Sequence, residues 1–85
     1  MSWGWEYVFG AEEAARTAAP AFLTEVERKA AELVRAAEAQ YLHGRAHEGD
    51  DPQGGDITVP GGMFTYQVVV RAERVYVVQI TYLGF

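Results

Sequence analysis

Apolar side chains recur every three or four positions between Pro20 and Leu42, and this repeat constrains the fold more than any other feature. It predicts one long amphipathic helix that buries a single stripe of side chains. The stripe consists of Phe22, Val26, Ala30, Leu33, Ala37 and Tyr41. Two starting points fit the pattern. Either Pro20 occupies the first helical position, or Thr24 and Glu27 form a capping box and the helix begins later.

Alternating segments on both sides of this helix predict strands. The segment WGWEYVFG places its four aromatic residues on one face of a first strand, and the alanine-rich residues 11–19 predict a short helix. After the long helix, the segments DITVP, MFTYQVVV and VYVVQITYL are separated by turns, so we expect two hairpins. The polar, glycine-rich residues 43–56 predict a flexible loop before them.

The order β-α-α-β-β-β over 85 residues predicts a single α+β domain spanning residues 1–85. We expect two helices packed on one face of a mostly antiparallel four-stranded sheet. The side chains expected against the helices are Trp5, Tyr7, Phe9, Phe64, Tyr66, Val68, Val70, Tyr76, Val78, Ile80 and Tyr82. Those expected on the opposite face are Glu6, Val8, Asp56, Thr58, Thr65, Gln67, Val69, Val75, Val77, Gln79 and Thr81. A shift of one residue in the register of a strand would exchange the two sets.

The second face of the sheet is the candidate binding surface, because two small helices cannot cover both sides of four strands. Its valines are expected to form an apolar strip with a rim of glutamine and threonine, a composition typical of a protein contact. The alternative is a solvated face whose valines serve β-strand formation. The residues predicted to bind a partner are Gln67, Val69, Val75, Val77, Gln79 and Thr81.

The net charge of −5 bounds the class of partner. Proteins that bind nucleic acid gain affinity when their basic residues neutralise phosphates. Because this chain is acidic, we do not expect nucleic acid as its main partner. Arg71 and Arg74 are clustered near the sheet and are the candidates for an anionic contact. The chain has no cysteine, no signal-peptide pattern and no apolar run near the ~20 residues of a membrane span. We therefore expect a cytoplasmic protein without a membrane contact.

His43 and His47 are the residues considered for a metal site, because histidines four positions apart on a helix can share an ion. Gly44 between them is expected to end the helix, and the chain has no cysteine or third histidine. The preferred interpretation is a solvated helix end. The only serine is Ser2, so no serine–histidine–aspartate arrangement is predicted. We expect no cofactor and no catalytic residue.

The element order and the closing hairpin YQVVVRAERVYVVQI resemble the RelE/ParE superfamily of toxins from bacterial toxin–antitoxin pairs. The resemblance covers nearly the whole chain and rests on topology and on the pattern Tyr-polar-Val-x-Val … Arg-Val-x-Val-x-x-Ile between Tyr66 and Ile80. It implies an antitoxin that wraps the toxin with a helix or an extended segment. It also implies one of two activities, cleavage of messenger RNA on the ribosome or, in the ParE-like branch, inhibition of DNA gyrase without nuclease chemistry.

Compared residue by residue, the resemblance does not extend to ribonuclease chemistry. RNA-cutting members have an arginine directly after the hairpin tyrosine, where this chain has Gln67, which can donate a hydrogen bond but carries no charge. They often carry basic residues on the strand after the long helix, where this chain has Asp56 and Thr58. We therefore expect a toxin homologue that acts by protein binding and is held by an antitoxin-like segment. The alternative is an orphan, non-toxic protein-interaction or self-associating module on the same fold.

Overall fold

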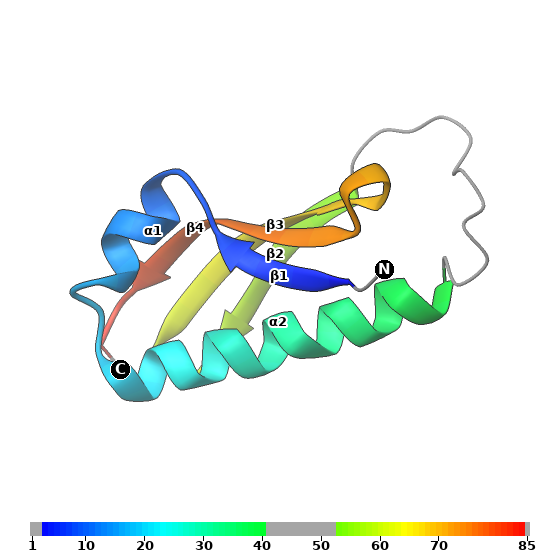
Figure 1. The fold of residues 1–85 in the computed structure, drawn as a ribbon. Helices are drawn as coiled ribbons and strands as arrows, with labels where there is room; N and C mark the ends of the chain where they lie inside the picture. Colours follow the sequence, from blue (N-terminus) through cyan, green and yellow to red (C-terminus); the bar gives the residue numbers. More distant parts are fainter. Residues whose placement is uncertain (1–2, 41–52, 85) are drawn as a thin grey trace.

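The computed structural model describes residues 3–40 and 53–84. Its helices and strands follow each other as β1 (Gly4–Tyr7), α1 (Gly10–Ala15), α2 (Pro20–Gln40), β2 (Gln53–Val59), β3 (Gly62–Val69) and β4 (Arg74–Tyr82). A short 3₁₀ helix, Val70–Ala72, joins β3 to β4. Figure 1 shows the long α2 running beneath the sheet, with α1 beside the end of β4.

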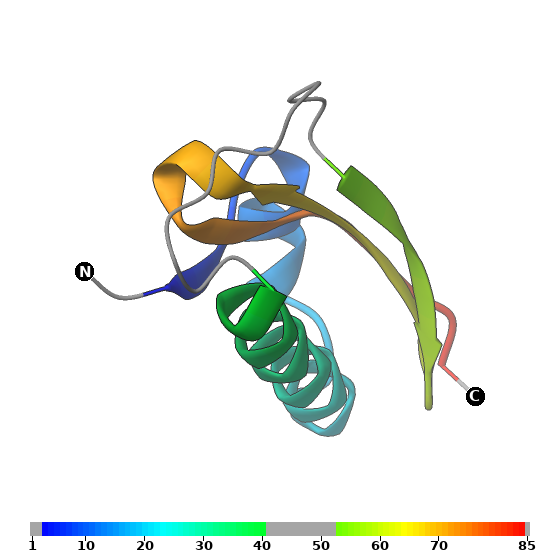
Figure 2. The same cartoon turned by 90° about the vertical axis from the view of Figure 1, so that its right-hand side faces the viewer.

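The four strands form one mixed sheet in the order β1-β4-β3-β2. The β2–β3 and β3–β4 pairs are antiparallel, whereas β1 runs parallel to β4. Figure 2 shows the sheet curving around α2, which lies on its concave side, and Ala11 of α1 is buried in the same core. The predicted α+β class, with two helices and a four-stranded sheet, is confirmed.

Helix α2 begins at Pro20, the first of the two predicted starting points. Proline suits this position because its fixed φ is helical and its missing N–H would have no partner there. The Thr24 hydroxyl donates to the Pro20 carbonyl at 3.0 Å, within the helix rather than in a capping box. The predicted stripe is largely confirmed. Its buried members are Phe22, Val26, Ala30 and Ala37, Leu33 is partly buried, and Tyr41 lies outside the described residues.

The hydrophobic core joins this stripe to the concave face of the sheet. Phe64 on β3 is 1% exposed, and its cross-strand neighbours are Ile57 on β2 and Ile80 on β4. Trp5 and Tyr7 of β1 and Tyr66 of β3 pack around the buried cluster, as predicted. Ala11 of α1 is completely buried, which places the short helix in the same core.

A β-bulge in β4 overturns part of the predicted face assignment. Thr65 pairs with Gln79 and the next residue, Tyr66, pairs with Val77, so Val78 is the extra residue in β4. A bulge shifts the alternation by one residue, which moves every side chain before it to the other face. Val75 and Val77 therefore point into the core, and both are 0% exposed.

Phe9 was predicted to continue the first strand on its core face, and this is wrong. Strand β1 ends at Tyr7, and Phe9 is 80% exposed in the turn before α1. Its φ of 56° and ψ of −136° lie in a region that glycine adopts readily and a bulky side chain does not. The backbone must turn here for α1 to return to the sheet, and that geometry carries the phenyl ring into solvent.

Phe9→Gly is expected to stabilise the protein. The substitution relieves backbone strain worth roughly 1–3 kcal/mol, against about 0.5–1 kcal/mol for the greater freedom of glycine in the unfolded chain. The exposed ring contributes little burial, so a gain of about 1 kcal/mol and a Tm increase of about 4–8 °C should follow. Thermal unfolding followed by circular dichroism measures it. Phe9→Ala is the control, because it removes the ring but keeps a Cβ at positive φ, and an equal gain in that variant would contradict the strain argument.

Strand β2 begins at Gln53, three residues earlier than the predicted strand, so the end of the predicted 43–56 loop is extended structure. Gly54 permits this pairing, since a Cβ built there would lie 2.6 Å from the Tyr66 carbonyl oxygen. The remainder of the predicted loop, from residue 43 to residue 52, lies outside the described residues.

Candidate functional site

The convex side of the sheet, called here the open face, carries no helix among the described residues (Figure 2). Strand alternation and the observed register place mostly uncharged side chains on it. The open face consists of Glu6, Asp56, Thr58, Met63, Thr65, Gln67, Val69, Arg74, Tyr76, Gln79 and Thr81. Its centre therefore combines amide and hydroxyl groups with one aromatic ring.

Four of the six predicted partner-binding residues lie on the open face. They are Gln67, Val69, Gln79 and Thr81, and among them Gln67 and Gln79 are exposed. Val75 and Val77 do not belong to this surface, because the bulge at Val78 buries both. The predicted apolar strip is therefore reduced to Val69 on the central strands, and no contact can use the other two valines.

Tyr76 takes the place that the prediction gave to these valines. It pairs with Gln67 on β3 and with Glu6 on β1, so it stands in the middle of the open face, although we expected it in the core. The sequence feature that could have indicated the bulge is the pair Val77–Val78, which interrupts the alternation of apolar and polar residues between Val75 and Gln79. Two adjacent apolar residues in a strand are compatible with a bulge, but the sequence does not say which one is extra.

Three contacts involve the charged side chains of the open face. The Thr65 hydroxyl donates to Asp56 Oδ1 at 2.6 Å, which joins β2 to β3 near the sheet edge. Arg74 Nε lies 3.7 Å from Glu6 Oε2, and Arg74 Nη1 donates to the Glu73 carbonyl at 3.0 Å. Glu6 therefore balances the charge of Arg74, whereas the Asp56 carboxylate has a neutral hydroxyl as its partner.

The two arginines predicted to contact an anion differ in their surroundings. Arg71 is exposed on the 3₁₀ helix between β3 and β4, whereas Arg74 is the first residue of β4 and lies beside Glu6. They are close in the chain, but the ion pair reduces the positive potential that Arg74 offers. An anionic contact at this end of the sheet stays a prediction.

The chain matches no protein-family model, no curated protein and no solved structure. Within residues 3–40 and 53–84, no three histidine or carboxylate side chains gather as metal ligands. His43 and His47, the pair considered for a metal, lie outside these ranges. No helix in the described part of the chain is long and apolar enough to cross a membrane.

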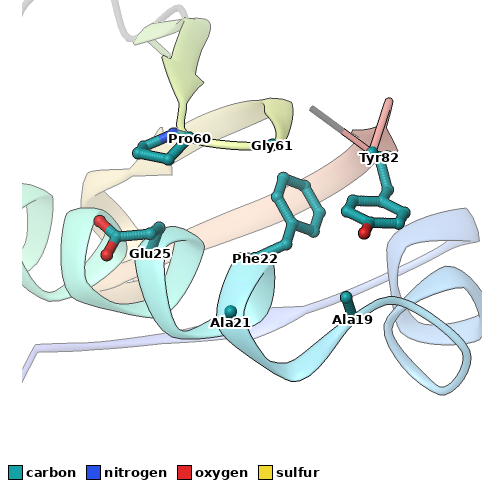
Figure 3. Close-up of a pocket in the computed structure, with 8 residues that line it drawn as sticks. Ala19, Ala21, Phe22, Glu25, Pro60, Gly61 and Tyr82 are labelled. Carbon is teal, nitrogen blue, oxygen red and sulfur yellow. The ribbon is translucent and has the colours of Figure 1, made fainter.

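An open hollow of about 370 Å³ lies at the start of α2, away from the open face (Figure 3). The rings of Phe22 and Tyr82 stand 5.1 Å apart in it, under the turn at Gly61. Gly61 has a φ of +97°, and a Cβ there would lie 3.3 Å from Phe22, so this turn requires glycine. Glu25 on the rim is ion-paired with Arg28 at 2.7 Å. The hollow therefore offers mainly apolar surface.

Tyr7 links the concave side of β1 to α2. Its hydroxyl donates to Glu27 Oε2 at 3.1 Å. Burial of the phenol raises the pKa of Tyr7 well above its usual value, and the bond to Glu27 and the charge of that carboxylate act in the same direction. The phenol therefore stays protonated and acts as a structural donor rather than as a proton-transfer group.

Proposed function

We propose that this protein is a RelE/ParE-like toxin homologue that acts by binding another protein and lacks ribonuclease chemistry. The observation that carries the proposal is the open face itself, a broad side of the sheet with uncharged groups and an aromatic ring at its centre. Tyrosine, amides and hydroxyls are typical of protein contacts, because they combine apolar area with hydrogen bonds. The element order and the closing hairpin support the family part of the proposal.

The charges near the hairpin argue against RNA cleavage. Gln67 stands exposed where the RNA-cutting branch has an arginine, and it offers an amide in place of a charge for the scissile phosphate. Arg74, the nearest cation on the open face, is already shared with Glu6 and with the Glu73 carbonyl. A phosphate would have to compete with both partners for this guanidinium.

Induction of the protein in a bacterial host tests the proposal. We expect growth to slow while ribosome-bound messenger RNA stays intact, as read by mapping of transcript ends. Tyr76→Asp places a charge at the centre of the open face and should relieve the growth defect without loss of protein. Glu38→Gln, on the exposed side of α2, is the matched control and should leave the defect unchanged.

Two results would count against the proposal in different ways. Discrete cleavage of transcripts that disappears in Gln67→Ala would show that the chain is a ribonuclease after all. Normal growth at high protein levels would contradict toxicity and would favour the alternative, an orphan, non-toxic module on the same fold.

A further inference from the structure

Strand β2 forms one edge of the sheet, and this edge is unusually available for pairing. Within residues 3–40 and 53–84, no strand pairs with its outer side. Edge strands in monomers are commonly short or carry lysine, proline or a bulge that blocks further pairing. The segment Gln53–Val59 is seven residues long, has no proline or basic residue, and pairs with β3 without a bulge. The opposite edge, β1, has only four residues.

The concave side of β2 is completely covered only at its end, where Val59 is 5% exposed. Figure 2 shows β2 as the strand farthest from α2, at the outer end of the curved sheet. Ile57 points to this side, opposite Phe64, but it is only half-buried, whereas Phe64 is 1% exposed. The core therefore includes Val59 and thins at Ile57, two residues earlier on the same side of β2, and additional apolar surface beside Ile57 would extend it.

We propose that β2 pairs antiparallel with β2 of a second copy about a two-fold axis, which joins the two sheets into one of eight strands. A two-fold axis normal to the sheet keeps both pairs of helices on the same side and lets the cores continue across the contact. The contact is made along the sheet edge and involves only Asp56 and Thr58 of the open face, not its centre at Tyr76, so it does not depend on the proposed function.

Charge and overlap together select the register. Asp56 is the only charged residue of β2, and a register centred on it would place two carboxylates directly opposite each other. Centring on Thr58 removes that repulsion but leaves only a short overlap before Pro60. Centring on Ile57 pairs the two isoleucines on the concave side and sets Asp56 opposite Thr58 of the second copy. This register therefore avoids the repulsion between the two carboxylates and keeps a longer overlap of the two strands.

Two lysine substitutions at neighbouring positions give opposite expected results. Ile57→Lys places like charges on the two-fold axis and removes the apolar pair, so the dissociation constant should rise at least about tenfold. Thr58→Lys adds the same charge but sets it opposite Asp56 of the second copy, so the dissociation constant should fall by about two- to fivefold. Sedimentation equilibrium of the full chain measures both, with circular dichroism to verify that each variant is folded.

Single cysteines test the register directly, because the natural chain has none. Ile57→Cys should form a covalent dimer with a short bismaleimide, whereas Asp56→Cys and Thr58→Cys should each link poorly alone and link to each other when mixed. Glu6→Cys, on the other edge of the sheet, should stay monomeric. A wild-type chain that remains monomeric at millimolar concentration overturns the proposal, and so does linkage that is equal at all four positions.

Discussion

Val77→Asp is expected to leave the protein unfolded at room temperature. Val77 is 0% exposed and lies in the core cluster with Phe64 and Val26. A carboxylate at this position would be buried without a partner, which costs several kcal/mol even if the group takes up a proton. Domains of this size have a total stability of about 5–15 kcal/mol, so one such change can consume most of it. Circular dichroism and urea titration of the purified variant measure the loss.

Tyr76→Asp is the matched control, one residue away on the same strand. Tyr76 lies on the open face, so its replacement should cost about 1 kcal/mol or less and leave the protein folded. Without the bulge at Val78, the two variants would exchange their effects, because Tyr76 would point to the core and Val77 to solvent. A folded Val77→Asp beside an unfolded Tyr76→Asp would therefore reject the register described above.

Phe64→Ala should destabilise the protein by about 3–5 kcal/mol, the range for removal of a fully buried aromatic side chain. Phe64 sits on a central strand between Ile57 and Ile80 and is 1% exposed, so truncation leaves a cavity that three strands and α2 border. The Tm should fall by tens of degrees, at about 4–8 °C for each kcal/mol in a domain of this length. Thermal and urea unfolding give the two values independently.

Met63→Ala is the control for Phe64→Ala. Met63 is the preceding residue and points to the open face, where it is only partly buried. Its truncation should cost about 1 kcal/mol, which is usual for a half-exposed apolar side chain. Equal losses at both positions would mean that the two faces of β3 are packed alike, contrary to the structure.

The helix and the sheet class were predictable because strong local patterns specify them. The apolar repeat from Phe22 to Ala37 has the period of a helix, and Pro20 marks its start. The pairing of β1 with β4 is different, since it joins residues distant in the chain and leaves no local pattern. The alternation of apolar and polar residues within each strand therefore could not predict that β1 pairs with β4.

The candidate site was predicted only in part, and the bulge explains why. Gln67 and Gln79 are polar, and their exposure followed directly from alternation. The valines before Val78 could not be assigned to either face of the sheet, because valine is common at both buried and half-exposed positions of strands. The turn at Phe9 was also not predicted, because an aromatic residue gives no sequence signal for a positive φ.

The parallel pairing of β1 with β4 has a consequence for how the chain reaches its folded state. Gly4 pairs with Arg74, about 70 positions away, so closing the sheet brings together segments near the two extremes of the described chain. Contacts of such separation form late, because a long loop must be closed before they can contribute. During synthesis, β1 leaves the ribosome before β4 and cannot pair until β4 follows, whereas the hydrogen bonds of α2 join residues only four positions apart. We therefore expect the aromatic side of β1 to be the last core surface to lose its water.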